Sequence, residues 1–324
     1  MKDVIGFGAL NLDLIYEIPD DVGAWHAMHL ESGGEILGDI NNFESVLKYL
    51  EIHGELICKS GGGQAANTIS ALSRMGFDTG YIGKVGTDEE GKFLIQGLEG
   101  VDTRGIVQGF SSGLCIALLN KTKSRKSFLI LPNCNDTLSY DEIDIDFARD
   151  TRFMHITSFI GDIPFNAQKR LASELSSKVK ISFDPNQIYA KKGLRGLIEI
   201  IRNSYIIFLT KKEIEFITNA NKGYKDSARE LLSLGPQIIV CKLGEEGSYI
   251  LSNEEEIVMP ADRVEVVDTV GAGDVYAAGF LGGLLLGRSL YDCALFGAKA
   301  AGLSISGYGR ERYPDKEFLH GAHK

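Results

Sequence analysis

The stretch Asp268–Phe280, DTVGAGDVYAAGF, combines a glycine-rich turn with an acidic residue at the start of a helix-forming run. Gly271 and Gly273 lack a Cβ, so the backbone there can turn tightly and approach a ligand closely. The run 274–286 is apolar and free of proline, which predicts a helix. The first N–H groups of such a helix have no intrahelical acceptor and lie at the positive end of its dipole. The stretch therefore predicts an anion site, typically for a phosphate.

Asp274 is unexpected in an anion site, because its carboxylate repels phosphate. Its presence is explained if it accepts the proton of a hydroxyl that attacks the phosphate. At a helix N-terminus we expect this carboxylate to stay ionised at neutral pH. The alternative is that Asp274 only caps the helix, since Asp is favoured at helix starts. From this stretch alone both interpretations remain open.

A second glycine-rich stretch, 61–76, reads GGGQAANTISALSRMG. Its apolar residues recur at three- and four-residue steps, which predicts a helix that ends at Gly76. Gln64 and Asn67 fall in the first turn and face the glycine loop. Neutral amides in this place suit a polyhydroxyl ligand better than a phosphate, although helix capping explains them equally well.

Two other glycine patterns predict no nucleotide site. Gly86–Lys92 has the spacing of a phosphate-binding P-loop, but Phe93 replaces the residue that would hold magnesium and three acidic residues would repel phosphate. We interpret 88–90 as a helix N-terminus. Gly6-Phe7-Gly8 begins a dinucleotide fingerprint, but no helical segment follows, which argues against a Rossmann dehydrogenase.

The elements that must position these residues alternate between strands and helices. The strands are predicted at Phe153–Ile156, Lys180–Phe183, Tyr205–Leu209 and Gln237–Cys241. This order is typical of a parallel sheet with helices on both faces and with ligand sites beyond the strand C-terminal ends. Residues 106–108, 114–119 and 127–131, together with 12–18, are predicted to form a small antiparallel sheet, with a polar turn at 120–126.

Composition excludes several functions. The chain has 324 residues, a net charge of −10 and no lysine- or arginine-rich face or tail, so neither nucleic acid nor an anionic membrane is expected as a partner. Five scattered cysteines indicate buried thiols in a reducing compartment. The N-terminus carries no signal-peptide pattern, and we expect a cytoplasmic protein. Residues 321–324, GAHK, look like a cloning remnant and are left out of the fold prediction.

The two glycine-rich stretches resemble the signatures of the ribokinase-like carbohydrate kinases, the PfkB group, which includes adenosine kinase. VGTDEEG, PNCND, DPN and KLGEEG follow one another between them in the family's order, so the resemblance covers nearly the whole chain. It implies one α/β domain over 1–320, a three-layer sandwich with a mainly parallel central sheet. A small β-sheet lid is expected at about 15–36 and 105–131, and in the family it often forms a homodimer contact.

The resemblance also implies a role for each matching residue. The catalytic base would be Asp274, and the anion hole for the γ-phosphate would consist of Gly271, Ala272 and Gly273. The acceptor hydroxyls would be bound by Asp13, Gly62 and Asn67. The nucleotide would be bound by Thr210, Lys242, Gly244, Gly247, Ala298 and Gly307. Glu213 would organise Mg²⁺ through water, and Asp268 and Val270 could hold a monovalent cation such as K⁺.

Two departures from the family pattern matter. Thr210 stands where the family usually has the asparagine of N-x-x-E, so a direct amide contact to phosphate is lost. Gln64 stands where ribokinases carry lysine, which weakens ribose as the acceptor. The sequence predicts an ATP- and magnesium-dependent kinase that phosphorylates a primary hydroxyl of a sugar or sugar-like molecule. A nucleoside kinase is the nearest alternative, and a catalytically inactive nucleotide or metabolite sensor is a third.

Overall fold

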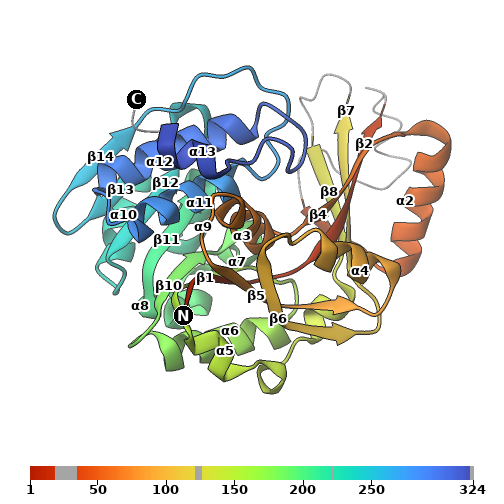
Figure 1. Ribbon diagram of the computed structural model, residues 1–324, viewed down its shortest axis with the longest axis horizontal. Helices are drawn as coiled ribbons and strands as arrows, with labels where there is room; N and C mark the ends of the chain where they lie inside the picture. Colours follow the sequence, from red (N-terminus) through yellow and green to blue (C-terminus); the bar gives the residue numbers. More distant parts are fainter. Residues whose placement is uncertain (19–34, 121–125, 220–221, 322–324) are drawn as a thin grey trace.

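The computed structural model describes residues 1–18, 35–120, 126–219 and 222–321, and a large mainly parallel sheet runs through most of this part of the chain (Figure 1). In spatial order its nine strands among the described residues are β14 (Glu256–Met259), β13 (Ser248–Ser252), β12 (Ile238–Lys242), β11 (Ser204–Thr210), β10 (Lys180–Asp184), β9 (Thr151–Thr157), β1 (Lys2–Phe7), β5 (Thr79–Gly86) and β6 (Val101–Gly109). Among these strands only the β12–β13 and β13–β14 pairs are antiparallel. The four strands expected between 153 and 241 are β9 to β12.

Helices cover both faces of this sheet. On one face lie α5 (Ile145–Arg149), α6 (Asp162–Leu175), α7 (Asn186–Ala190), α8 (Gly193–Asn203), α9 (Lys211–Thr218) and α10 (Tyr224–Leu232). On the other lie α3 (Gln64–Arg74), α4 (Glu89–Gln96), α11 (Ala272–Leu285), α12 (Leu290–Ser304) and α13 (Lys316–Gly321). The predicted three-layer arrangement is thereby confirmed.

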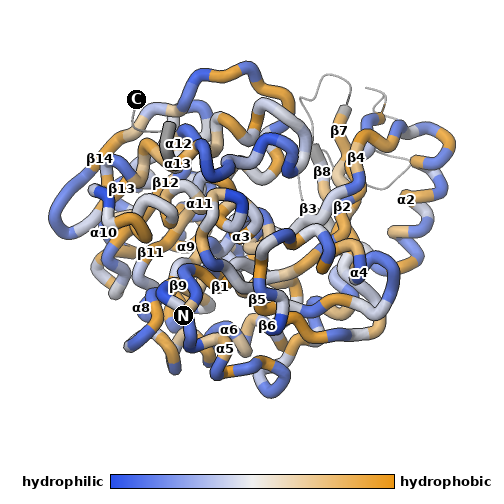
Figure 2. The backbone as a smooth tube through the Cα atoms, viewed as in Figure 1, coloured by the Kyte–Doolittle hydropathy of each residue, from blue (hydrophilic) through white to orange (hydrophobic). Residues whose placement is uncertain are grey.

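The strands divide their side chains between these two layers. In β11, Ile206 and Phe208 pack against the α3 and α11 side, whereas Ile207 and Leu209 pack against the α6 to α10 side. This follows from the two-residue period of a strand, which sends successive side chains to opposite faces. Both faces are apolar, as expected of strands in a parallel sheet covered by helices. Figure 2 shows the apolar residues concentrated on the inner strands and helices and the hydrophilic ones in outer loops.

A smaller sheet stands apart from the large one (Figure 1). Its strands among the described residues follow the order β3 (Glu35–Leu37), β8 (Lys126–Leu131), β7 (Gly113–Asn120), β2 (Asn11–Ile18) and β4 (Glu55–Gly62). One face is covered by α2 (Ile40–His53), which contributes Phe43, Val46 and Leu50. The opposite face carries Asp13, Cys115 and Phe128 and lines a cavity toward the main body.

The small sheet differs from its prediction in three respects. Residues 105–109, expected there, belong to β6 of the large sheet, where the absent side chain of Gly105 leaves room for the Phe147 ring. β4, expected in the main body, pairs antiparallel with β2. The sheet is also mixed, because β2 pairs parallel with β7 and β3 with β8. These partnerships depend on contacts between distant segments, so no local pattern encodes them.

Some sequence predictions fall on segments outside the described residues. These are 19–34 of the expected lid, 121–125 of the predicted turn, and 322–324 of the tail. No helix in the described ranges is long and apolar enough to cross a membrane.

Candidate active site

The N-terminus of α11 places Asp274 at the centre of the site. Gly271, which precedes the helix, has φ +76°, a left-handed conformation that a residue with a Cβ rarely adopts. The chain therefore turns sharply into the helix, and Asp274 falls in its first turn. Its side chain is buried with 8% exposure, and its backbone carbonyl accepts a hydrogen bond from Thr68 Oγ1 at 3.1 Å. The glycine turn and the helix start predicted from sequence are both present.

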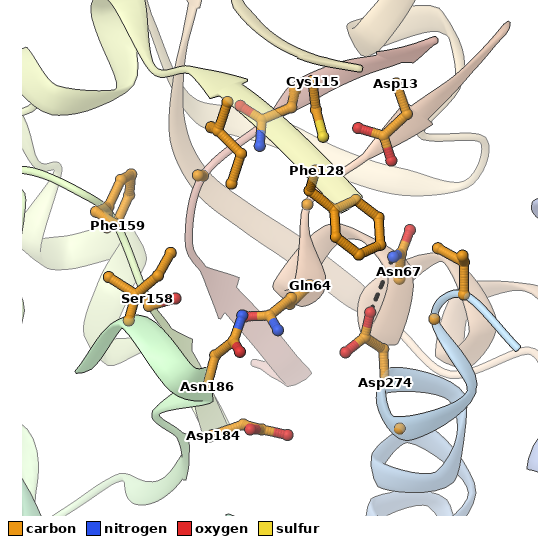
Figure 3. Close-up of a pocket in the computed structure, with 18 of the residues that line it drawn as sticks. Asp13, Gln64, Asn67, Cys115, Phe128, Ser158, Phe159, Asp184, Asn186 and Asp274 are labelled. Carbon is orange, nitrogen blue, oxygen red and sulfur yellow. Dashed lines mark hydrogen bonds between the residues drawn. The ribbon is translucent and has the colours of Figure 1, made fainter. Parts of the chain in front are cut away.

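The second glycine-rich stretch meets Asp274 directly. Asn67, in the first turn of α3, donates from Nδ2 to Asp274 Oδ2 at 2.9 Å, the contact drawn as a dashed line in Figure 3. Gly63, just before this helix, has φ +105°, and a Cβ there would lie 2.1 Å from the carbonyl oxygen of Ala9. The two stretches, about 200 residues apart in sequence, therefore form one site.

A cavity of about 570 Å³ opens between these helix N-termini and the small sheet. Asp13 lies on the small-sheet side and Asp274 on the main-body side (Figure 3). Apolar side chains of both sides form part of the wall, including Phe128 and Phe159. A cavity with convergent polar groups on partly apolar walls is typical of a small-molecule site.

Local contacts hold Asp13 and its strand in place. Gly62 of β4 lies against the Asp13 carboxylate, since a Cβ at Gly62 would be only 2.0 Å from Oδ2. Asn135 binds the turn before β2, donating to the Leu10 carbonyl at 2.9 Å and accepting from the Leu10 N–H at 3.0 Å. These contacts fix the start of β2, and with it Asp13, against the main body.

Burial raises the pKa of both carboxylates. It raises the pKa of Asp274 to about 7, although the hydrogen bond from Asn67 lowers it in part. Burial likewise raises the pKa of Asp13 to about 7, against the field of Arg310. The expectation that Asp274 stays fully ionised at neutral pH is therefore wrong, because desolvation of its carboxylate outweighs the helix N-terminus.

Three neighbouring strands of the large sheet end in polar or charged residues. Asp184, Thr210 and Lys242 are the last residues of β10, β11 and β12, at the edge where parallel sheets bind ligands. Lys242 Nζ pairs with Asp184 Oδ2 at 2.5 Å. Burial lowers the pKa of Lys242, but the nearby Asp184 and Glu213 outweigh it, so the pKa is raised overall.

Thr210 and Glu213 form a reciprocal helix cap. Thr210 Oγ1 accepts from the Glu213 N–H at 3.3 Å, and Glu213 Oε2 accepts from the Thr210 N–H at 2.7 Å. Burial raises the pKa of Glu213, and the charge of Asp184 raises it further. Both residues line the 570 Å³ cavity, so the threonine that replaces the usual asparagine still faces it.

A second cavity, of about 930 Å³, adjoins the first at Gly244 and Thr269, which line both. Gly247, Ala272 and Ala298 are in its wall, as are the segment 260–266 and one side of α12. Gly244 and Gly247 have φ +64° and +98°, conformations that glycine adopts readily. Gly307, which was predicted to bind the nucleotide, is not among the residues that line this cavity. The backbone of Gly307 packs against the Arg312 side chain.

The predicted cation residues lie beside the glycine turn. The Val270 N–H donates to Asp268 Oδ1 at 3.0 Å, and only Val270 of the two lines the first cavity. The P-loop-like segment is a helix start, as predicted, because Asp88 Oδ1 accepts from the Gly91 N–H at 2.8 Å.

Sequence reasoning missed several residues of the site. Arg310 donates from Nε and Nη2 to Asn67 Oδ1 at 3.3 and 3.2 Å. Asn135 was noticed only as part of the motif PNCND, and Asp184 only in DPN at a strand end where ligand sites are expected, both without an individual role. Nothing near Arg310 in sequence points to Asn67.

Comparisons with known proteins agree with this geometry. The model of the pfkB family carbohydrate kinases matches residues 30–315. An uncharacterized sugar kinase of Archaeoglobus fulgidus is 38% identical, over 75% of this chain and 98% of that protein. An ATP-dependent ribose-1-phosphate kinase of Halopiger xanaduensis is 31% identical, over 69% of this chain and 73% of that protein.

Solved structures share the fold at lower identity. Adenosine kinase from Sinorhizobium meliloti has a TM-score of 0.87 at 22% identity, covering 99% of this chain and 98% of that one. An uncharacterized sugar kinase from Pyrococcus horikoshii, solved in complex with ATP, has a TM-score of 0.75 at 24% identity, covering 97% of this chain and 96% of that one. With both glycine-rich signatures meeting at one cavity and the family model matching from 30 to 315, this chain belongs to the pfkB family of carbohydrate kinases and is a phosphotransferase with an alcohol group as acceptor.

Proposed function

We propose that this protein transfers the γ-phosphate of ATP to a primary hydroxyl of a sugar or sugar-like molecule bound in the 570 Å³ cavity. The observation that carries the proposal is the position of Asp274. It lies on the turn that separates the two cavities and faces the one that also contains Asp13. A donor in the larger cavity and an acceptor in the smaller would therefore meet at this carboxylate.

Asp274 acts as the general base. The acceptor oxygen forms a bond to the γ-phosphorus, the bond from that phosphorus to the bridging oxygen of ADP breaks, and the hydroxyl proton passes to the Asp274 carboxylate. The transition state is loose, so positioning and charge stabilisation supply most of the catalysis. With a pKa of about 7, Asp274 has both the charge and the basicity to take the proton near neutral pH.

The N–H groups of Gly271, Ala272 and Gly273 form the anion hole for the phosphate. They lie at the start of α11, where backbone N–H groups lack intrahelical acceptors, and the Ala272 N–H makes a long hydrogen bond to the Thr269 carbonyl at 3.4 Å. Donors fixed in this way need no reorganisation as charge develops on the phosphate oxygens. A side chain at Gly273 would also crowd Lys242, since its Cβ would lie 3.2 Å from Nζ.

The acceptor and donor occupy opposite sides of the turn. Asp13 and Asn67 bind the acceptor hydroxyls, and the missing side chain of Gly62 leaves room for the Asp13 carboxylate. The nucleotide is bound by Gly244, Gly247 and Ala298 of the larger cavity and, on family resemblance alone, by Gly307. Thr210 and Lys242 line the smaller cavity, where they would contact the phosphates of the nucleotide. The Pyrococcus horikoshii relative binds ATP on the same fold, which supports ATP as the donor.

Mg²⁺ is the metal that fits the residues present. In the described ranges no three metal-ligating side chains cluster, which suits an ion held mainly by water and phosphate oxygens. Glu213, a hard oxygen ligand facing the cavity, would hold it through water. When bound, Mg²⁺ neutralises charge on the transferring phosphate. A monovalent cation at Asp268 and Val270 stays a prediction.

The small sheet is proposed to act as the lid. It carries Asp13 and Phe128 on the face toward the cavity, so its closure would exclude water from the reacting phosphate. Dimerisation through this sheet, the cytoplasmic location and the absence of a nucleic-acid partner stay predictions. The curated relatives include a fructokinase and 5-dehydro-2-deoxygluconokinases, which supports a sugar rather than a nucleoside as acceptor.

The test is an ADP-release screen over neutral sugars, sugar acids and nucleosides, with ATP and Mg²⁺ present. Asp274→Asn is the matched control. We expect acceptor-dependent ADP release with at least one sugar and its loss in the variant. ADP release that depends on a nucleoside alone would replace the sugar with a nucleoside acceptor, and release unaffected by Asp274→Asn would remove the proposed base.

A further inference from the structure

The Arg310 guanidinium binds the side-chain oxygen of Asn67. Its Nε and Nη2 atoms both donate to Asn67 Oδ1, at 3.3 and 3.2 Å. The Nδ2 atom of the same amide donates to Asp274 Oδ2 at 2.9 Å. A continuous chain of hydrogen bonds therefore runs from the guanidinium through the amide to the carboxylate.

The chemistry of the three groups allows only one orientation of the amide. A guanidinium carries donors and no acceptor, whereas an ionised carboxylate carries acceptors only. If the Asn67 amide were rotated by 180°, its NH₂ group would face the donors of Arg310 and its oxygen would face the Asp274 carboxylate. Both contacts would become repulsive. Arg310 thus selects the orientation in which Asn67 donates to Asp274.

Arg310 is itself fixed by two further contacts. Its Nη1 atom donates to the Gly97 carbonyl at 3.3 Å, and its own carbonyl accepts from Arg74 Nη1 at 2.7 Å. It also lies next to β4, because a Cβ at Gly61 would be 3.6 Å from Arg310 Nη1. The guanidinium is therefore held between α3, the end of α4 and the small sheet.

We propose that Arg310 is a positioning residue for phosphoryl transfer, which fixes the Asn67 amide so that its N–H group holds the Asp274 carboxylate toward the acceptor hydroxyl. The inference rests on the proposed role of Asp274 as the base. It assigns to Asn67 two tasks, since one N–H of Nδ2 binds Asp274 and the second stays available for an acceptor hydroxyl.

Arg310 also affects the electrostatics of the site. The titratable and charged groups around Asp274 are Asp13 of β2, Tyr81 of β5, Asp184 of β10, Lys242 of β12, and Tyr313 and Arg310 of the C-terminal segment. The charge of Arg310 lowers the pKa of Asp13 directly, against the larger effect of burial. It acts on Asp274 through the Asn67 hydrogen bond, which lowers the pKa of that carboxylate.

The test compares Arg310→Ala and Arg310→Lys with Arg312→Ala, an exposed arginine of the same segment. For Arg310→Ala we expect kcat/KM for the acceptor to fall about tenfold to a hundredfold, as for the loss of a hydrogen bond to a charged group. The acid limb of its pH profile should move to higher pH, because the ionised form of Asp274 loses support. Arg310→Lys keeps the charge but not the paired donors, so it should recover part of the loss, and Arg312→Ala should match wild type.

A double-mutant cycle with Asn67→Ala shows whether Arg310 acts through the amide. We expect Arg310→Ala to cost little more once Asn67 is gone, whereas a residue that only stabilises the fold would add its full effect. Melting temperatures of all variants are measured alongside, and Arg310→Lys carries the test if Arg310→Ala does not fold.

The result distinguishes the two proposals. An unshifted acid limb with additive effects, while Asp274→Asn remains inactive, would overturn the role of Arg310 and leave the proposed function intact. Near-normal turnover of Asp274→Asn would instead overturn the proposed base, and the role of Arg310 with it.

Discussion

The two cavities of this protein are built in different ways. The larger one, proposed for the nucleotide, is lined by residues that all lie between 244 and 305 in sequence. The smaller one, proposed for the acceptor, combines residues from β2, α3, β7, β8 and the ends of β10 to β12, so both sheets contribute to it. A site made from one continuous region depends mainly on local packing. A site made between two sheets depends on how those sheets sit relative to one another.

This difference suggests that the two cavities recognise their substrates in different ways. The nucleotide cavity contains glycines in left-handed turns and the small side chains of α12, which admit a ligand by leaving space. The acceptor cavity contains two carboxylates with raised pKa values, which select a ligand by hydrogen bonding. Substitutions of Asp13, Asn67 and Asp274 in the acceptor cavity should therefore change catalysis and acceptor use, and substitutions in the nucleotide cavity should change ATP affinity alone.

The largest expected effect is on turnover in Asp274→Asn, which keeps the shape of the side chain and removes the proton acceptor. The rate should fall at least about 10²–10⁴-fold, the range for general base catalysis. Removal of a charge that repels phosphate should leave ATP affinity equal or higher. Single-turnover rates and ATP titration of the same variant measure both. Near-normal turnover would reduce Asp274 to a helix cap.

A smaller effect is expected at the acceptor side for Asp13→Ala. The sugar hydroxyls lose a charged partner, which costs on the order of 1.5–3 kcal/mol of acceptor binding in the reacting state. Asn67→Ala should cost less at the hydroxyls because its amide is neutral. Steady-state kinetics with varied acceptor, and ATP affinity as the control, check this. An equal loss of ATP binding would mean that the acceptor site is misplaced.

The raised pKa of Asp274 also predicts a dependence of stability on pH. A carboxyl whose pKa rises from 3.8 unfolded to about 7 folded supports folding below the lower value, and that support is lost as pH rises toward 7. Asp274→Asn should therefore be more stable than wild type at pH 8, by on the order of a few kcal/mol.

The same linkage predicts that the stability difference shrinks toward pH 4, where the wild-type carboxyl is protonated in both states. Denaturant unfolding of both proteins across this pH range measures it. An equal or lower stability of the variant at pH 8 would show that the carboxylate is better solvated than its burial implies.

The smallest effect is expected in the nucleotide cavity. Ala298 of α12 lines it with 8% exposure, so Ala298→Leu would fill space meant for the ligand. We expect ATP affinity to fall about tenfold, from an overpacking cost of about 1–3 kcal/mol. KM for the acceptor should stay within error, and Ala301→Leu on the same helix is a second variant for comparison. A matching change in acceptor KM would contradict the separation of the two cavities.

The sequence by itself determined the elements whose signals are local. Glycines before an apolar helix predicted the turns at Gly63 and Gly271, and the alternation of strand-like and helical segments predicted β9 to β12. Asp88 was identified as a helix cap because three acidic residues in a P-loop spacing repel phosphate. Each of these follows from backbone conformation or charge within a few residues, so a short window of sequence contains the cause.

Only the tertiary structure decided which distant groups meet. β4 joins the small sheet and β6 the large one because strand partners are selected by packing across the whole chain. Arg310 reaches Asn67 across 243 residues, which no periodicity records. The pKa of Asp274 was predicted wrongly because burial is a property of the folded molecule. A charge favoured at an exposed helix start loses hydration once neighbouring parts of the folded chain bury it.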